Sequence, residues 1–172
     1  MNYLDKSIIE IHEALVNKEI TVYELVKESL KRAHENKDNA FETILDEYAL
    51  NKAKQCDEKG IEKDNYLYGI PYVAKDNFST KDIETTGSSN ILKGYIPLFD
   101  ATVIKYLNDA GAILIAKATL DELAMGGSGT SGHKGITYNP YDSKHEHMVG
   151  GSSCGSAVAV AAGIVPFALG SD

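Results

Sequence analysis

Short apolar runs alternate with helical patterns along this chain, and the alternation limits the folds available to it. Residues 69–74, 112–116 and 164–169 are rich in aliphatic and β-branched side chains, as buried strands are. Helical patterns between such runs argue against a succession of hairpins and favour parallel pairing. We therefore expect an α/β fold with a mixed, largely parallel sheet flanked by helices. Pro71 lacks a backbone N–H, which places the start or the edge of a strand there.

Capping pairs mark two helices near the N-terminus. Ser7 with Glu10, and Thr21 with Glu24, have the spacing of a capping box. Each pair precedes apolar residues at helical intervals, which predicts an amphipathic helix pair. Residues 47–56 follow as a third, more polar helical pattern.

Two more helix caps are predicted further along the chain. Asp100 is placed to cap a helix over residues 101–110, which Gly111 would end. Thr119 and Glu122 have the spacing that would cap another short helix.

The composition fits one globular domain or part of a larger one. Of the 172 residues, 43% are hydrophobic and 24% are charged, which argues against disorder. We expect residues 1–60 to form a helical region that packs on residues 61–172, the first part of the core. The chain stops where a core strand has just reached a loop, which predicts that the remainder of the domain lies beyond Asp172.

Charge and cysteine content narrow the classes of function. A net charge of −8 argues against a protein that grips nucleic acid through its own Lys and Arg side chains. No stretch approaches the ~20 apolar residues of a membrane span, and the N-terminus lacks a signal-peptide pattern. Cys56 and Cys154 lie far apart, provide no disulfide or metal framework, and suit a reducing, cytoplasmic compartment.

Residues 150–157 combine glycines with the adjacent hydroxyl groups of Ser152 and Ser153. Such a loop can bring hydroxyl and amide N–H groups to a reacting centre, although a loop without chemistry is the alternative. Residues 151–155 also match the G-x-S-x-G turn of serine hydrolases, with Ser153 central. That triad requires a later histidine. The last histidine, His147, precedes the serines, so this triad cannot be completed within the chain.

Lys75 stands directly after the apolar run of residues 69–74. Burial disfavours a charged ammonium, so a lysine at this place can become a neutral base. A serine–lysine pairing needs no histidine, which makes Lys75 a candidate partner for the serines. The alternative is an ordinary surface lysine paired with Asp76.

Residues 127–132 fit the pattern G-x-G-x-x-G, but they follow a short helical pattern and not a strand, so a dinucleotide site is not indicated. The P-loop pattern also fails at its lysine position. We interpret the loop as a wall on the substrate side, with Ser128 and Gly129 as candidate binding residues. Residues 145–147 (His-Glu-His) lack a third ligand, and we expect a solvated loop there and no metal site.

Taken together, these motifs resemble the amidase signature family. The resemblance begins at residue 69 and consists of an ordered set of segments: residues 69–71, 75–77, 85–88, 100–103, 111–112, 121–126, 150–153 and 170–172. It implies the fold of that family, which is the α/β fold expected above. Cys154 departs from the family, which usually has Gly or Ser at this position, and we expect it to pack inside the turn.

The resemblance also implies roles for individual residues. The catalytic set of the family is Ser–cis-Ser–Lys, so by motif position Lys75 would be the base and Ser152 the bridging serine beside a cis peptide bond. Ser153 is a further candidate for substrate binding. The nucleophilic serine, the N–H groups of the oxyanion hole and the residues that hold glutamine are implied to lie beyond Asp172. This chain alone is therefore expected to be inactive.

Residues 121–126 and the N-terminal helix pair most resemble the branch of that family that hydrolyses glutamine for tRNA-dependent amidation. This implies that ammonia passes to a partner protein, which binds misacylated tRNA and uses ATP and Mg, and that a small third subunit completes the complex. No cofactor is expected in this chain itself. A stand-alone amidase acting on small amides, or a non-enzymatic binding module built on the glycine-rich loops, remains an alternative.

Overall fold

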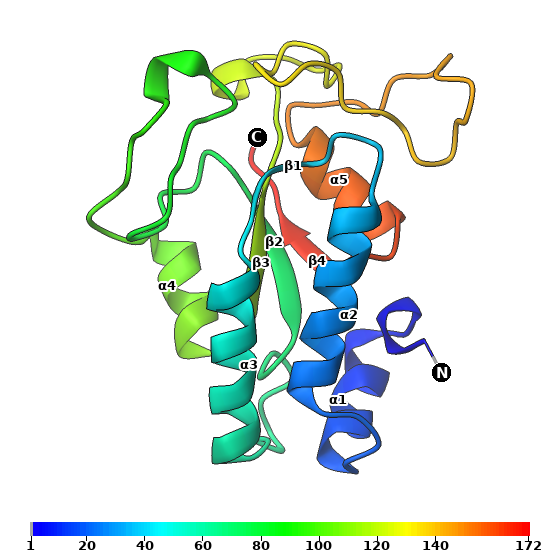
Figure 1. Cartoon of the computed structure of the whole chain (residues 1–172), viewed down its shortest axis with the longest axis vertical. Coiled ribbons are helices and arrows are strands. Elements are labelled where there is room, and N and C mark those ends of the chain that lie inside the picture. Colours follow the sequence, from blue (N-terminus) through cyan, green and yellow to red (C-terminus); the bar gives the residue numbers. More distant parts are fainter. Residues whose placement is uncertain (1) are drawn as a thin grey trace.

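A four-stranded sheet lies between helices at the centre of the molecule. The computed structural model describes residues 2–172, and Figure 1 shows their arrangement. The helices are α1 (Ile8–Val16), α2 (Val22–Glu35), α3 (Asp46–Lys59), α4 (Thr102–Asp109) and α5 (Cys154–Ala161), with 3₁₀ turns η1 (Tyr3–Asp5), η2 (Asn90–Leu92) and η3 (Glu122–Ala124). The strands are β1 (Phe41–Ile44), β2 (Pro71–Lys75), β3 (Ile113–Ala118) and β4 (Phe167–Leu169).

The strand order β1-β3-β2-β4 confirms the expected mixed, largely parallel sheet. β2 lies inside the sheet and runs parallel to both β3 and β4, while β1 pairs antiparallel with β3. Pro71 is the first residue of β2, where its missing N–H is tolerated. The run of residues 164–169 contributes only the short, half-buried β4. β1 was not predicted, because its four residues are all half-buried and show no alternating apolar pattern.

Side chains of β2 alternate between the two faces of the sheet. Tyr72 and Ala74 pack with Ile104 of α4 on one face. Val73 packs on the other face, in the cluster that includes residues of α2 and α5. Because successive residues of a strand point to opposite faces, Lys75 faces the same side as Val73. Figure 1 shows α5 on that side, beside β4.

Both N-terminal capping boxes are present, as predicted. The hydroxyl of Ser7 accepts from the N–H of Glu10, whose carboxylate accepts from the N–H of Ser7, and Thr21 and Glu24 repeat the exchange. The helices that follow share their apolar core with β2 and β3. The boundary near residue 60 stays a prediction. No helix within residues 2–172 is long and apolar enough to cross a membrane.

The other two predicted helix caps are wrong. The carboxylate of Asp100 accepts from the N–H of Lys81 at 2.7 Å, and α4 begins after Ala101. The hydroxyl of Thr119 donates to the carbonyl of Asn39 at 2.9 Å, and only the turn η3 follows. Each side chain holds a segment distant in the sequence, which local spacing does not reveal.

Candidate active site

Lys75 and Ser152 meet where the end of β2 approaches the start of α5. Lys75 is fully buried, and its Nζ lies 2.6 Å from Oγ of Ser152, although 77 positions separate the two residues. The peptide bond between Gly151 and Ser152 is cis. The structure therefore brings together the two side chains that the sequence singled out as base and bridging serine.

Ser171 and Asn77 complete the surroundings of the amine, and sequence reasoning missed both. The Lys75 amine donates to Oγ of Ser171 at 2.8 Å and approaches its carbonyl oxygen at 3.3 Å. The side-chain amide of Asn77 donates to the same Oγ at 2.9 Å. A signal existed, because Ser171 follows β4 and Asn77 follows β2. Parallel strands deliver their carboxyl ends to one edge of a sheet.

The environment of Lys75 favours its neutral form. Burial lowers the pKa of the amine below its ordinary 10.5. The nearby groups that oppose this shift are Cys154, Asp121 and Asp172. The three oxygens around the amine suit either protonation state, since a neutral amine has two N–H donors and one lone pair. The arrangement is that of a base able to take a proton from Ser152.

Asp76 does not pair with Lys75, so the surface-lysine alternative is wrong. Its carboxylate lies 3.0 Å from Nζ of Lys117, a second fully buried lysine, on β3. Oδ2 of Asp76 also accepts from the N–H and the hydroxyl of Thr86. The segment after Lys75 is thereby fixed to β3, which holds the end of β2 in place.

Ser153 and Cys154 differ from Ser152 in what they contact. The hydroxyl of Ser153 accepts from the N–H of Ser171 at 3.2 Å and donates to its carbonyl at 3.3 Å. Sγ of Cys154 is buried and lies 3.4 Å from the hydroxyl of Thr137. Cys154 packs inside the turn as expected. A role for Ser153 in binding substrate stays a prediction.

The glycine-rich loop points its backbone N–H groups toward the protein's own Asp121, a residue that sequence reasoning left without a role. The N–H groups of Ser128 and Gly129 both donate to its carboxylate. Gly129 has a positive φ of 75°, and a Cβ there would press on Val149 and Cys154. These contacts give Gly129 a packing role. Substrate binding by Ser128 and Gly129 stays a prediction.

The loop of residues 145–147 lies at the surface. The ring of His147 is paired with the carboxylate of Asp142 at 2.8 Å, and the ring of His145 packs on Tyr138. Within residues 2–172, no group of three or more His, Cys, Asp or Glu side chains comes together as a metal site would require.

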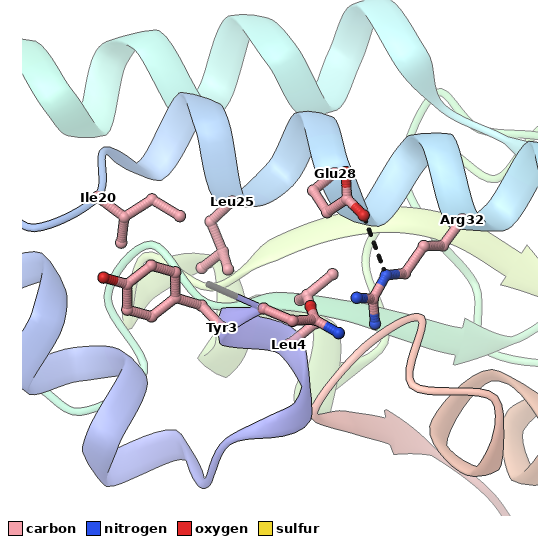
Figure 2. Close-up of a pocket in the computed structure, with 7 residues that line it drawn as sticks. Tyr3, Leu4, Ile20, Leu25, Glu28 and Arg32 are labelled. Atoms are coloured by element: carbon pink, nitrogen blue, oxygen red, sulfur yellow. Dashed lines mark hydrogen bonds and ion pairs between the residues drawn. The ribbon is translucent and has the colours of Figure 1, made fainter.

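A hollow between η1 and α2 is the main alternative place for a ligand. Figure 2 shows it lined by Tyr3, Leu25 and Arg32, among others. The guanidinium of Arg32 is already paired with Glu28 and Asp5, and it donates to a backbone carbonyl. These contacts give the Arg32 guanidinium a role in stabilising the fold. The pairing of Lys75 with Ser152 is therefore the better candidate for chemistry.

Comparisons with known proteins identify the family of the chain. Residues 24–172 match the family described as Amidase. The chain is 46% identical over 173 residues to the A subunit of glutamyl-tRNA(Gln) amidotransferase from Oenococcus oeni, and 47% identical over 174 residues to that from Streptococcus pneumoniae strain Hungary19A-6. These matches cover 99% and 100% of the chain but 35% of each relative, so the chain spans about a third of their length.

Solved structures with the same fold include both amidases and a component of an amidotransferase. The peptide amidase from Stenotrophomonas maltophilia superposes with a TM-score of 0.86 at 31% identity, over 96% of this chain and 36% of its own. The A subunit of glutamyl-tRNA(Gln) amidotransferase from Thermotoga maritima does so with a TM-score of 0.72 at 34% identity, over 99% of this chain and 34% of its own.

Proposed function

The chain belongs to the amidase family, and we propose that it forms part of the glutamine-hydrolysing subunit of a tRNA-dependent amidotransferase. The main observation in support of amide hydrolysis is the buried contact of 2.6 Å between Nζ of Lys75 and Oγ of Ser152. The identity of 46–47% over almost the whole chain to the A subunits of such amidotransferases supports the choice of branch.

In the proposed mechanism, Lys75 and Ser152 relay a proton. The neutral Lys75 amine takes the proton of the Ser152 hydroxyl, and Ser152 takes one from a nucleophilic serine as that serine attacks the amide carbon of glutamine. The proton returns along the same path to the leaving nitrogen, and ammonia departs. Water then hydrolyses the acyl-enzyme and releases glutamate.

The nucleophile is proposed to lie outside this chain, in a glycine-rich segment that follows Asp172 in the complete gene product. The backbone N–H groups that stabilise the oxyanion belong to the same segment. The coverage of only 35% of the relatives' length supports this proposal. Residues 1–172 alone would then hold the base and the bridging serine in place without turning over glutamine.

The ammonia is proposed to reach a partner subunit that binds misacylated Glu-tRNA(Gln), activates its glutamate with ATP and Mg, and forms Gln-tRNA(Gln). A small third subunit would complete a heterotrimer in the cytoplasm. The net charge of −8 supports a division of labour in which the partner, and not this chain, contacts the RNA. No cofactor is assigned to this chain.

A second candidate is a stand-alone amidase that acts on small amides. A specific observation favours it: the amidase structures superpose with TM-scores of 0.86–0.87, whereas the Thermotoga maritima protein reaches 0.72. The sequence identities point the other way, because the relatives at 46–47% are components of amidotransferases.

The test measures release of glutamate from glutamine by the complete gene product, alone and with its partner subunits, ATP and misacylated tRNA. We expect hydrolysis that increases when the partners and the tRNA are added, and none from residues 1–172 alone. Hydrolysis indifferent to partner and tRNA would instead identify a stand-alone amidase. A complete gene product that hydrolyses no amide would overturn both and point to a binding module.

A further inference from the structure

The carboxylate of Asp121 lies at the centre of the glycine-rich loop. It is fully buried and accepts five hydrogen bonds of 2.9–3.2 Å, from the N–H groups of Ser128, Gly129, Thr130 and Ser131 and from the Ser131 hydroxyl. Among residues 2–172 it forms no ion pair, so these five donors provide its direct contacts. Burial by itself would raise the pKa of this carboxyl, but the hydrogen bonds outweigh burial and lower it, so the group stays ionised at neutral pH.

The same carboxylate presses against the peptide that carries Ser152. A Cβ at Gly151 would collide with Oδ2 of Asp121, and a Cβ at Gly126 would also collide with its side chain. The backbone N–H of Asp121 donates to the carbonyl of Ser152 at 3.1 Å. Asp121 thus joins the glycine-rich loop to the turn that presents the Ser152 hydroxyl to Lys75.

We propose that Asp121 is a positioning residue of this site: its carboxylate gathers the loop of residues 126–132 beside Gly151 while its backbone N–H holds the carbonyl of Ser152, and together they keep the Ser152 hydroxyl at the Lys75 amine. Its side chain bonds to the loop and acts on the reacting groups through the turn. The inference deepens the proposed amidase function and rests on it only for the measurement of turnover. A hydroxyl-to-amine contact of 2.6 Å needs such support, because small misplacements of catalytic groups are costly.

The charge of Asp121 offers a readout that does not depend on turnover. Its negative charge favours the ammonium form of Lys75. The other acidic groups that act on this amine are Cys154 on α5 and Asp172, and Asp121→Asn leaves both in place. Removing the charge therefore lowers the pKa of Lys75 further. This pKa therefore reports how close the Asp121 carboxylate lies to the amine, and turnover in the folded variant separates positioning from a purely structural role, which would reduce stability alone.

The experiment titrates the Lys75 side chain by NMR in the complete gene product labelled with [¹³Cε]lysine, with the Lys75→Met variant to assign the resonance. In Asp121→Asn we expect the midpoint to move to lower pH by about half a unit or more, because an opposing charge has gone. We also expect glutamine turnover to fall about tenfold or more with little change in KM, since positioning acts in the transition state.

Asp121→Glu moves the carboxylate but keeps its charge. It is used in place of Asp121→Asn if that variant fails to fold. It keeps the charge, so the midpoint of Lys75 stays near that of the wild type. Turnover still falls, because the Asp121 side chain is packed tightly against Gly126 and Gly151 and leaves no space for an extra methylene. Turnover like that of the wild type in Asp121→Glu would overturn the positioning role.

Asp142→Asn is the matched control. Asp142 also accepts from several backbone N–H groups, in the surface loop of residues 139–148, and it does not contribute to the pKa of Lys75. We expect lower stability with no change in the Lys75 midpoint. A midpoint unchanged in folded Asp121→Asn as well would overturn the inference, whether or not the protein hydrolyses glutamine. A wild type that titrates as expected but hydrolyses no amide would contradict the proposed function alone.

Discussion

The carboxylate of Asp76 and the amine of Lys117 form a buried ion pair at 3.0 Å, one residue beyond the candidate base. Both residues are fully buried. Lys117 also donates to the carbonyl of Phe78 and the hydroxyl of Thr85. Burial raises the pKa of the Asp76 carboxyl and lowers that of the Lys117 amine, and each charge counteracts the shift of the other.

Lys117→Met is expected to destabilise the protein strongly. It leaves the Asp76 carboxylate buried without its counter-ion, which typically costs about 3–5 kcal/mol in the free energy of unfolding. Denaturant-induced unfolding of the complete gene product measures the loss. Lys105→Met is the control, because Lys105 pairs with Asp109 on the exposed surface of α4, where solvent screens the pair and it contributes little to stability. Equal effects of the two substitutions would contradict a structural role for the buried pair.

Lys75→Met is expected to abolish the base without disturbing the fold. The methionine side chain fills the same space but takes no proton, so hydrolysis of glutamine is expected to fall about 10²–10⁴-fold. Steady-state kinetics of the complete gene product measure this, with circular dichroism to verify the fold. Turnover within about tenfold of the wild type, or 1.4 kcal/mol in the barrier, would contradict the role of base.

Ser152→Ala is expected to harm turnover far more than Ser153→Ala. Oγ of Ser152 is the atom in contact with Lys75, whereas Oγ of Ser153 contacts only the backbone of Ser171. Removing the first interrupts the proposed proton path, and removing the second loosens a neighbouring turn. The comparison of kcat between the two variants is decisive, because the reverse ranking would assign the relay to Ser153.

Glutamine hydrolysis is expected to increase with pH as the Lys75 amine loses its proton. The base works only when neutral, and burial lowers its pKa below 10.5, so activity is lost as pH falls through that lowered pKa. The profile of kcat/KM against pH for the complete gene product reports the midpoint. A midpoint at or above 10.5 would mean that the Lys75 site is better solvated than its burial implies.

Most of the fold could be predicted from local patterns, and the exceptions have a common cause. The capping boxes at Ser7 and Thr21 bond within their own helices, so spacing alone reveals them. Asp100 and Thr119 are also residue types that cap helices, yet they bond to Lys81 and Asn39. Where a side chain finds its partner far along the chain, local spacing predicts the wrong role.

The candidate site could be predicted only in part, because some of its contacts also join residues that are distant in the sequence. Lys75 and Ser152 each stand in a recognisable local setting, the end of an apolar run and a glycine–serine turn. The carboxylate of Asp121 is recognisable only through the loop that folds around it, because its donors begin seven positions later at Ser128. Ser171 is recognisable only once β4 is known to lie beside β2.

Gly151→Ala tests the packing around the cis peptide directly. A methyl group at Gly151 would collide with Oδ2 of Asp121, a buried charge that cannot withdraw without breaking its bonds to the loop. The turn that carries Ser152 must move instead, so glutamine turnover is expected to fall about tenfold or more, since positioning contributes heavily to rate. Kinetics and thermal unfolding of the complete gene product measure the two effects.

Gly127→Ala is the matched control for that substitution. A Cβ at Gly127 would meet no atom within 4 Å, and its φ is not in the left-handed region. Turnover and thermal stability are therefore expected to stay close to those of the wild type, although Gly127 belongs to the same glycine-rich loop. If the two variants behaved alike, the space beside Asp121 would not limit the position of Ser152, because the added methyl group meets Asp121 at Gly151 and no atom at Gly127.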